Sequence, residues 1–116
     1  MPETEDIVRL RHMLDSARRA AQLTETCRRA DLDKDDKLAL ALVRLLEILG
    51  EAAKNVSDNC RRENPVIPWR QIAGTRDRLI HGYFDVDLDI VWKIISVDIP
   101  SLIPQLEKAL GEDVSG

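Results

Sequence analysis

Aromatic residues are scarce in this sequence, which has two Trp, one Tyr and one Phe among 116 residues. Runs of β-branched residues are short, and Leu, Ala, Arg, Glu and Asp dominate the composition. Strands favour aromatic and β-branched residues, whereas Leu, Ala, Arg and Glu favour helix. The composition therefore predicts an all-α fold.

Long apolar runs are also missing, so we expect no segment that spans a membrane. The first six residues, MPETED, are acidic and unlike a signal peptide, which favours a cytoplasmic protein. Hydrophobic residues make up 44% of the chain and charged residues 33%, a balance typical of a folded protein. We expect one domain over residues 1–116, with a frayed tail at 110–116.

Cysteine is rare, and the two that occur, Cys27 and Cys60, are far apart in the sequence. They form no CxxC pair and have no histidine at metal-ligand spacing, so we expect neither a disulfide nor a metal site. The sequence also has no Gly-rich phosphate loop.

Apolar residues recur at helical spacing in four or five segments that are separated by short polar breaks. Asp33, with Asp36 three residues on, resembles a capping arrangement for the second segment. Gly82 is a natural stop for the third. The predicted helices are 3–29, 34–57, 68 to 80 or 81, a fourth capped by Asp85 or Asp87, and a fifth segment at Pro100 with Asp98 as its cap.

The second predicted helix is apolar over a broad face, which indicates burial on more than one side, by its own core or by a second subunit. Gly50 lies in its middle, at a cost of about 1 kcal/mol relative to Ala. The close approach of another backbone, at a helix crossing or a dimer axis, would explain this glycine. We expect Glu47 and Glu51 to meet an arginine from elsewhere in the chain.

Charge is unevenly distributed along the chain, which has a net charge of −4. Residues 61–81 carry five arginines against two carboxylates, a local charge of +3. This stripe could guide RNA phosphates through Arg61, Arg62 and Arg70. Alternatively, the arginines pair with carboxylates on a solvated face, and charge alone leaves both interpretations open.

The stretch from Arg76 to Tyr83 is the candidate site, because it combines guanidinium, carboxylate, imidazole and phenol groups. An imidazole moves a proton near neutral pH, and a guanidinium stabilises charge on a reacting phosphate. We expect His81 near a helix C-terminus, where the dipole favours the imidazolium. Because no carboxylate cluster suits Mg²⁺, we expect a metal-independent mechanism that uses the 2′-OH of RNA as nucleophile.

One imidazole cannot easily act as base and acid on opposite sides of a phosphorus atom. A two-fold dimer would bring two copies of Arg76 and His81 together across its axis. The alternative interpretation is structural: a buried Arg–Asp pair, a histidine at a helix end and a tyrosine bonded to the backbone.

The pattern Arg76-Asp77-x-x-x-His81-x-Tyr83 resembles the R-polar-x-x-x-H-x-Y motif of HEPN-superfamily proteins of the HepT-like type. Three further segments resemble this family in the same order, so that the likeness covers roughly residues 5–110. These segments are LEILGEAAK at 46–54, IPWRQIAG at 67–74 and DLDIVW at 87–92.

This resemblance implies a four- or five-helix up-and-down bundle that forms a homodimer with a composite cleft. It implies a toxin with metal-independent RNase activity, in which Arg76 and His81 are catalytic. We expect Asp77, Arg78 and Tyr83 to support them, with Asp77 orienting Arg76 or His81.

The resemblance also implies a partner, a minimal nucleotidyltransferase of the MNT type, which neutralises the toxin by transferring AMP onto Tyr83. ATP would serve that partner, and this chain would need no cofactor. One alternative is a non-catalytic interaction module that binds a nucleotide or docks the nucleotidyltransferase. Another is a helical dimer scaffold.

Overall fold

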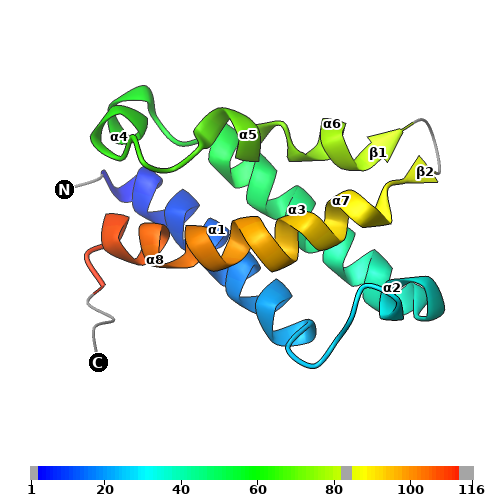
Figure 1. Cartoon of the computed structure of the whole chain (residues 1–116). Coiled ribbons are helices and arrows are strands. Elements are labelled where there is room, and N and C mark those ends of the chain that lie inside the picture. The colour runs from blue at the N-terminus through cyan, green and yellow to red at the C-terminus, as the bar shows by residue number, and fades with distance from the viewer. Residues whose placement is uncertain (1–2, 82–84, 113–116) are drawn as a thin grey trace.

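Helices account for nearly all of the regular structure in the computed structural model, which describes residues 3–81 and 85–112. In Figure 1 the chain runs one way along α1 (Thr4–Leu23) and back along α3 (Asp36–Lys54). It then runs forward along α5 (Trp69–Ala73) and α6 (Thr75–Leu79) and returns along α7 (Leu88–Lys93) and α8 (Ile99–Ala109). The predicted all-α bundle is confirmed.

The first helix ends earlier than the predicted 3–29. The hydroxyl of Thr24 donates to the carbonyl of Ala20 at 2.9 Å, which is the acceptor that the Thr24 amide would use in a continuing α-helix. The amide of Thr24 turns instead to Ala21. A separate short helix, α2 (Asp31–Lys34), follows this turn.

The predicted cap of the second long helix is wrong by two residues. Asp33 lies inside α2, whereas Asp35 is extended and its Oδ1 accepts from the amide of Leu38 at 3.0 Å. Asp35 is therefore the N-cap, and α3 begins at Asp36.

The stretch between the second and third predicted helices, residues 58–67, contains another helix, α4 (Asp58–Glu63). Ser57 caps it by accepting from the amide of Cys60 at 3.2 Å. The buried carboxylate of Asp6 accepts from the Ser57 amide at 2.8 Å and from its hydroxyl at 2.6 Å. These bonds dock the start of α4 against α1.

The third predicted helix, expected to run unbroken to residue 80 or 81, is interrupted at Gly74 and ends at Leu79. Ile80 is extended because the carbonyl of Leu79 accepts from the amide of Asp87 at 2.8 Å. Two short strands follow, β1 (Ile80–His81) and β2 (Asp85–Val86), which pair antiparallel with His81 opposite Asp85. The predicted stop at Gly82 lies outside the described residues.

The last helices are continuous, and the predicted break at Pro100 does not occur. Of the two predicted caps, Asp87 is the one that caps α7, because its Oδ1 accepts from the amides of Asp89 and Ile90 at 3.1 Å. A π-helical segment, η1 (Ile94–Asp98), joins α7 to α8. The ring of Pro100 crowds the helical turn that precedes it, and the wider turn of η1 relieves this crowding. Asp98 is helical and caps nothing.

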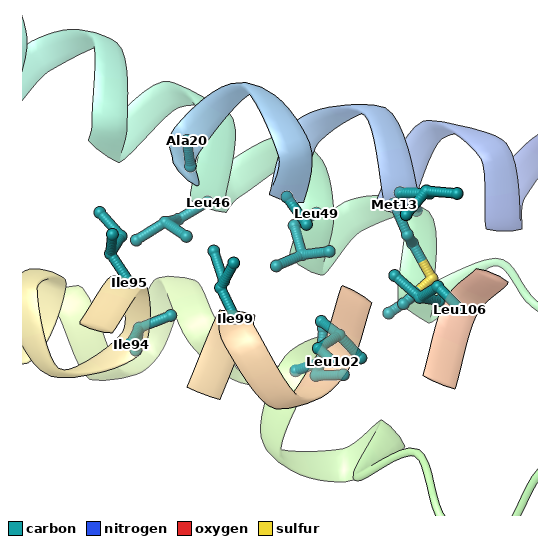
Figure 2. Close-up of a cluster of buried hydrophobic side chains, with 14 of the residues drawn as sticks. Met13, Ala20, Leu46, Leu49, Ile94, Ile95, Ile99, Leu102 and Leu106 are labelled. Carbon is teal, nitrogen blue, oxygen red and sulfur yellow. The ribbon is translucent and has the colours of Figure 1, made fainter. Parts of the chain in front are cut away.

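The core lies between α1, α3 and the continuous helical segment formed by η1 and α8, where the labelled side chains of Figure 2 meet. The C-terminal end of α8 is held against α1, because Arg18 contacts both Glu107 and Glu112 and Arg11 contacts Glu112. Residues 110–112 are therefore not a frayed tail, and residues 113–116 lie outside the description. No helix among the described residues is long and apolar enough to cross a membrane.

Candidate functional site

Arg76 lies on α6 with an exposed side chain, 70% accessible, that faces α3. Its Nε atom lies 4.0 Å from Oε2 of Glu47, so the predicted meeting with an arginine from elsewhere is confirmed for Glu47. Among the ion pairs within the described residues, none includes Glu51. A polar hollow of about 210 Å³ opens beside the pair of Arg76 and Glu47. We call it the Arg76 hollow, and it is lined by Arg44, Glu47, Gly50, Glu51, Lys54, Ala73 and Arg76.

Gly50 sets the distance between α3 and the helix that carries Arg76. A Cβ atom at Gly50 would lie 3.0 Å from the carbonyl oxygen of Ile72 and 3.5 Å from Cβ of Thr75. The backbones of α3 and α5 thus approach too closely for a side chain at this position. The predicted close approach of another backbone is confirmed, and within this chain it is a helix crossing.

Asp77 and Arg78 do not join Arg76 in one cluster. Asp77 is exposed, and among the described ion pairs none involves it. Arg78 points to another side of α6, where its Nη1 lies 3.8 Å from Oδ2 of Asp98 and it lines a largely apolar hollow of about 270 Å³. The structural interpretation of a buried Arg76–Asp77 pair is therefore wrong, because Arg76 is exposed and meets Glu47.

His81 is not at a helix C-terminus, which corrects the prediction that a helix dipole acts on it. Its backbone lies in β1, two residues beyond the end of α6. The position of its side chain is not described, and Tyr83 lies outside the described residues altogether. Their roles stay predictions from the sequence.

The three arginines predicted to bind RNA have different surroundings. Nη2 of Arg61 donates to the carbonyls of Ala53 at 2.9 Å and Lys54 at 3.1 Å. These bonds provide partners for two carbonyl groups that the C-terminal end of α3 would otherwise leave unpaired. Arg62 donates to the side-chain oxygen of Asn59. Arg70 is exposed on α5. Arg61 thus has a structural role that competes with phosphate binding.

A second hollow, of about 180 Å³, lies on the other side of α3. Arg9 and His12 from α1, and Arg44 from α3, have no role among the predictions made from the sequence. The available signal was the spacing of Arg44, Glu47 and Glu51, which places them on one helix face. We call it the His12 hollow, and it is lined by Arg9, His12, Arg44, Glu47, Ile48, Glu51, Ala52 and Asn55.

Metal-ligating side chains are dispersed, and within residues 3–81 and 85–112 no three of them gather at one place. Both cysteines are free. Cys60 packs in the core, and its burial raises the pKa of the thiol. The thiol is therefore a poor nucleophile.

Known proteins resemble this chain over most of its length. Residues 13–109 match the family model described as ribonuclease HepT-like. A Thermococcus cleftensis protein named as a probable ribonuclease HepT is 50% identical over 64% of this chain and 67% of its own length. A Caldanaerobacter subterraneus protein named as a candidate RNase is 45% identical over 72% of this chain and 74% of its own.

A third relative, from Methanocaldococcus jannaschii, is also named as a candidate RNase and is 32% identical over 82% of this chain and 87% of its own length. No solved structure gives a match. The family match covers more than half of the sequence, and it includes the whole Arg76–His81 segment. The chain therefore belongs to the HepT-like ribonuclease family.

Proposed function

We propose that this protein is a ribonuclease that cleaves RNA through Arg76 and His81. The observation that carries the proposal is the exposed guanidinium of Arg76 beside a polar hollow, in a chain of the HepT-like ribonuclease family. Arg76 pairs with one carboxylate, that of Glu47 at 4.0 Å. Exposed ion pairs contribute little to folding stability, about 1 kcal/mol or less. A substrate phosphate can therefore replace Glu47 at small cost.

The proposed chemistry needs a base, an acid and a cation. The base removes the proton from the 2′-OH, whose oxygen attacks the adjacent phosphorus. The bond from phosphorus to the 5′ oxygen breaks, and the acid protonates that oxygen. A 2′,3′-cyclic phosphate and a free 5′-OH result. His81 supplies the proton transfers, and Arg76 stabilises the negative charge that develops on the phosphate oxygens.

A homodimer would supply the second imidazole. The opposite sides of the phosphorus require two proton-transfer groups, and each chain has one histidine in the motif. On α3 the side chain of Leu40 is 69% exposed, and a contact between two copies through this helix would bury it. We propose that two copies of Arg76 and His81 form one composite site across a two-fold axis.

Regulation by a partner enzyme follows from the motif tyrosine. We propose that a minimal nucleotidyltransferase of the MNT type transfers AMP from ATP onto Tyr83, and that this chain acts as the toxin of a two-gene module. Co-expression with the neighbouring gene should add the mass of one AMP to the intact protein. Tyr83→Phe should abolish this addition, and mapping of the AMP to another residue would contradict the assignment.

A non-catalytic module that docks the nucleotidyltransferase is the alternative function. The exposed carboxylate of Asp77, next to Arg76, favours it because a negative charge repels RNA. The two functions differ in one measurement. Purified protein in excess EDTA should cleave RNA to cyclic-phosphate ends if the ribonuclease proposal is correct, whereas the docking module leaves RNA intact.

A further inference from the structure

The Arg76 hollow and the His12 hollow, on the two sides of α3, share one wall. Arg44, Glu47 and Glu51 line both the Arg76 hollow and the His12 hollow, and we call these three residues the α3 ridge. Helix α3 packs against α1 on one side and against α5 and α6 on the other. The two hollows are therefore adjoining depressions that lead from α1, across the α3 ridge, to Arg76.

Positive charge predominates along this surface, although the chain as a whole is acidic. Four cations, Arg9, Arg44, Lys54 and Arg76, line the two hollows together with the carboxylates of Glu47 and Glu51, which gives a local charge of +2. The whole chain has a net charge of −4. A local excess of cations on an acidic body concentrates phosphates at one place.

Within the described residues, three of these four cations form no ion pair with a carboxylate. Among the ion pairs within the described residues, Arg76 contacts Glu47, but none includes Arg9, Arg44 or Lys54. By contrast, Arg11, Arg18 and Arg29 are all paired. The charge along the two hollows is therefore available to an external anion.

We propose that the α3 ridge and its two hollows form a track for RNA phosphates, from Arg9 past Arg44 to Arg76. This inference rests on the proposed ribonuclease function of Arg76. The track spans about two interhelical spacings, on the order of 16–20 Å, which exceeds the size of a single phosphate. Glu47 and Glu51 repel phosphates from the space between the cations and so restrict where each phosphate binds.

The path through α4 and α5 that the charge pattern of the sequence suggests offers fewer available cations. The guanidinium of Arg61 is bound to two carbonyls at the end of α3, and that of Arg62 is bound to Asn59. RNA would have to break these bonds before it could use either side chain. The track over α3 requires only the displacement of Glu47 from Arg76.

The track is tested by measuring the affinity of a short fluorescent 2′-O-methyl oligoribonucleotide, which has no free 2′-OH and cannot be cleaved. Arg44→Gln and Arg9→Gln should each bind it about three- to tenfold more weakly than the wild type. Each should also reduce the slope of log affinity against log salt by about 0.7, the value for one phosphate contact on a single strand.

The matched control is Arg28→Gln. Arg28 is exposed and lines neither hollow, and it lies beyond the C-terminal end of α1, whereas Arg9 lies near the N-terminal end. The control removes the same charge and should leave affinity and slope within twofold of the wild type, on the order of the change expected from net charge alone. Circular dichroism establishes that each variant is folded.

Several outcomes would overturn the track: no binding by the wild type, equal losses in Arg44→Gln and Arg28→Gln, or losses confined to Arg62→Gln and Arg70→Gln. Cleavage of unmodified RNA by the wild type is measured in parallel. Binding that depends on Arg44 without any cleavage supports the track and overturns only the ribonuclease proposal. Cleavage with unchanged binding by Arg44→Gln overturns only the track.

Discussion

The Nε atom of Arg76 lies 4.0 Å from Oε2 of Glu47, across the contact between α6 and α3. The position of Glu47 on α3 predicts a contact with an arginine from elsewhere in the chain, and the structure identifies this arginine as the proposed catalytic one. The pair is solvent-accessible, so that a phosphate from solution can compete with the carboxylate for the guanidinium.

Removing the charge of Glu47 should strengthen RNA binding. In Glu47→Gln a phosphate no longer competes with a carboxylate for Arg76, so we expect the KM for RNA to fall about two- to fivefold. Steady-state cleavage kinetics measure this change. Glu51→Gln removes the same charge from the same ridge without a described contact to Arg76, and a fall in its KM as large as that of Glu47→Gln would contradict the specific pairing.

Gly50 should not tolerate a larger side chain. In Gly50→Val the new Cβ would meet the Ile72 carbonyl at 3.0 Å, and α5 and α6 would have to move away from α3. We expect the free energy of unfolding to fall by about 2 kcal/mol or more, measured by urea denaturation. The neighbouring exposed position gives the control, Glu51→Ala, with an expected change within about 0.5 kcal/mol. Equal stability of the two variants would refute the close crossing.

The contact of Asp6 with Ser57 should be a main attachment of α4. Asp6 is buried and accepts two hydrogen bonds from Ser57, so Asp6→Ala removes two bonds to a charged group and should cost about 1–3 kcal/mol of unfolding free energy. Asp15→Ala, at an exposed position of the same helix, should change it by less than about 0.5 kcal/mol. Thermal unfolding of both variants compares them directly, and a similar small loss in both would argue against the attachment.

The C-terminal ion pairs should make stability depend on pH in acid. The hydrogen bond from Arg11, followed by that from Arg18, lowers the pKa of Glu112 below its ordinary value of 4.5. The folded state therefore binds this proton less readily than the unfolded state. Its stabilising contribution is complete above pH 4.5 and is lost as the pH falls through the lower value of the folded state.

Glu112→Gln should remove this part of the acid dependence. Urea denaturation at a series of pH values should give a smaller acid loss of stability for Glu112→Gln than for the wild type. Glu25→Gln, an exposed carboxylate outside the described ion pairs, should keep the full dependence. The assignment fails if Glu112→Gln and the wild type lose stability in parallel.

The sequence predicted those features that local chemistry determines. Helical spacing located the long helices, and it limited the cap of α7 to Asp85 or Asp87, of which the structure selects Asp87 because Asp85 lies in β2. Asp33 and Asp35 both offer a carboxylate near the start of α3, and the choice between them depends on α2, which the sequence pattern did not reveal.

Tertiary contacts determined the features that the sequence did not predict. Helix α6 ends at Leu79 because its carbonyl accepts from Asp87, eight residues further along the chain. Local propensity carries no information about such a bond, and His81 was consequently placed at a helix end rather than in β1. Arg61 was similarly assigned to RNA, because nothing in the sequence shows that it satisfies the carbonyls of Ala53 and Lys54.

The composite site is the central claim, and mixing the wild type with an inactive variant tests it most directly. Wild-type and His81→Ala chains are mixed at several ratios, briefly unfolded together and refolded so that mixed dimers form, and RNA cleavage is then measured in EDTA. His81→Ala alone should be inactive. A mixed dimer holds only one of the two imidazoles that the shared site requires, so activity should fall as the square of the wild-type fraction. Activity in simple proportion to the wild-type fraction would mean that each chain has its own site, and would contradict the claim.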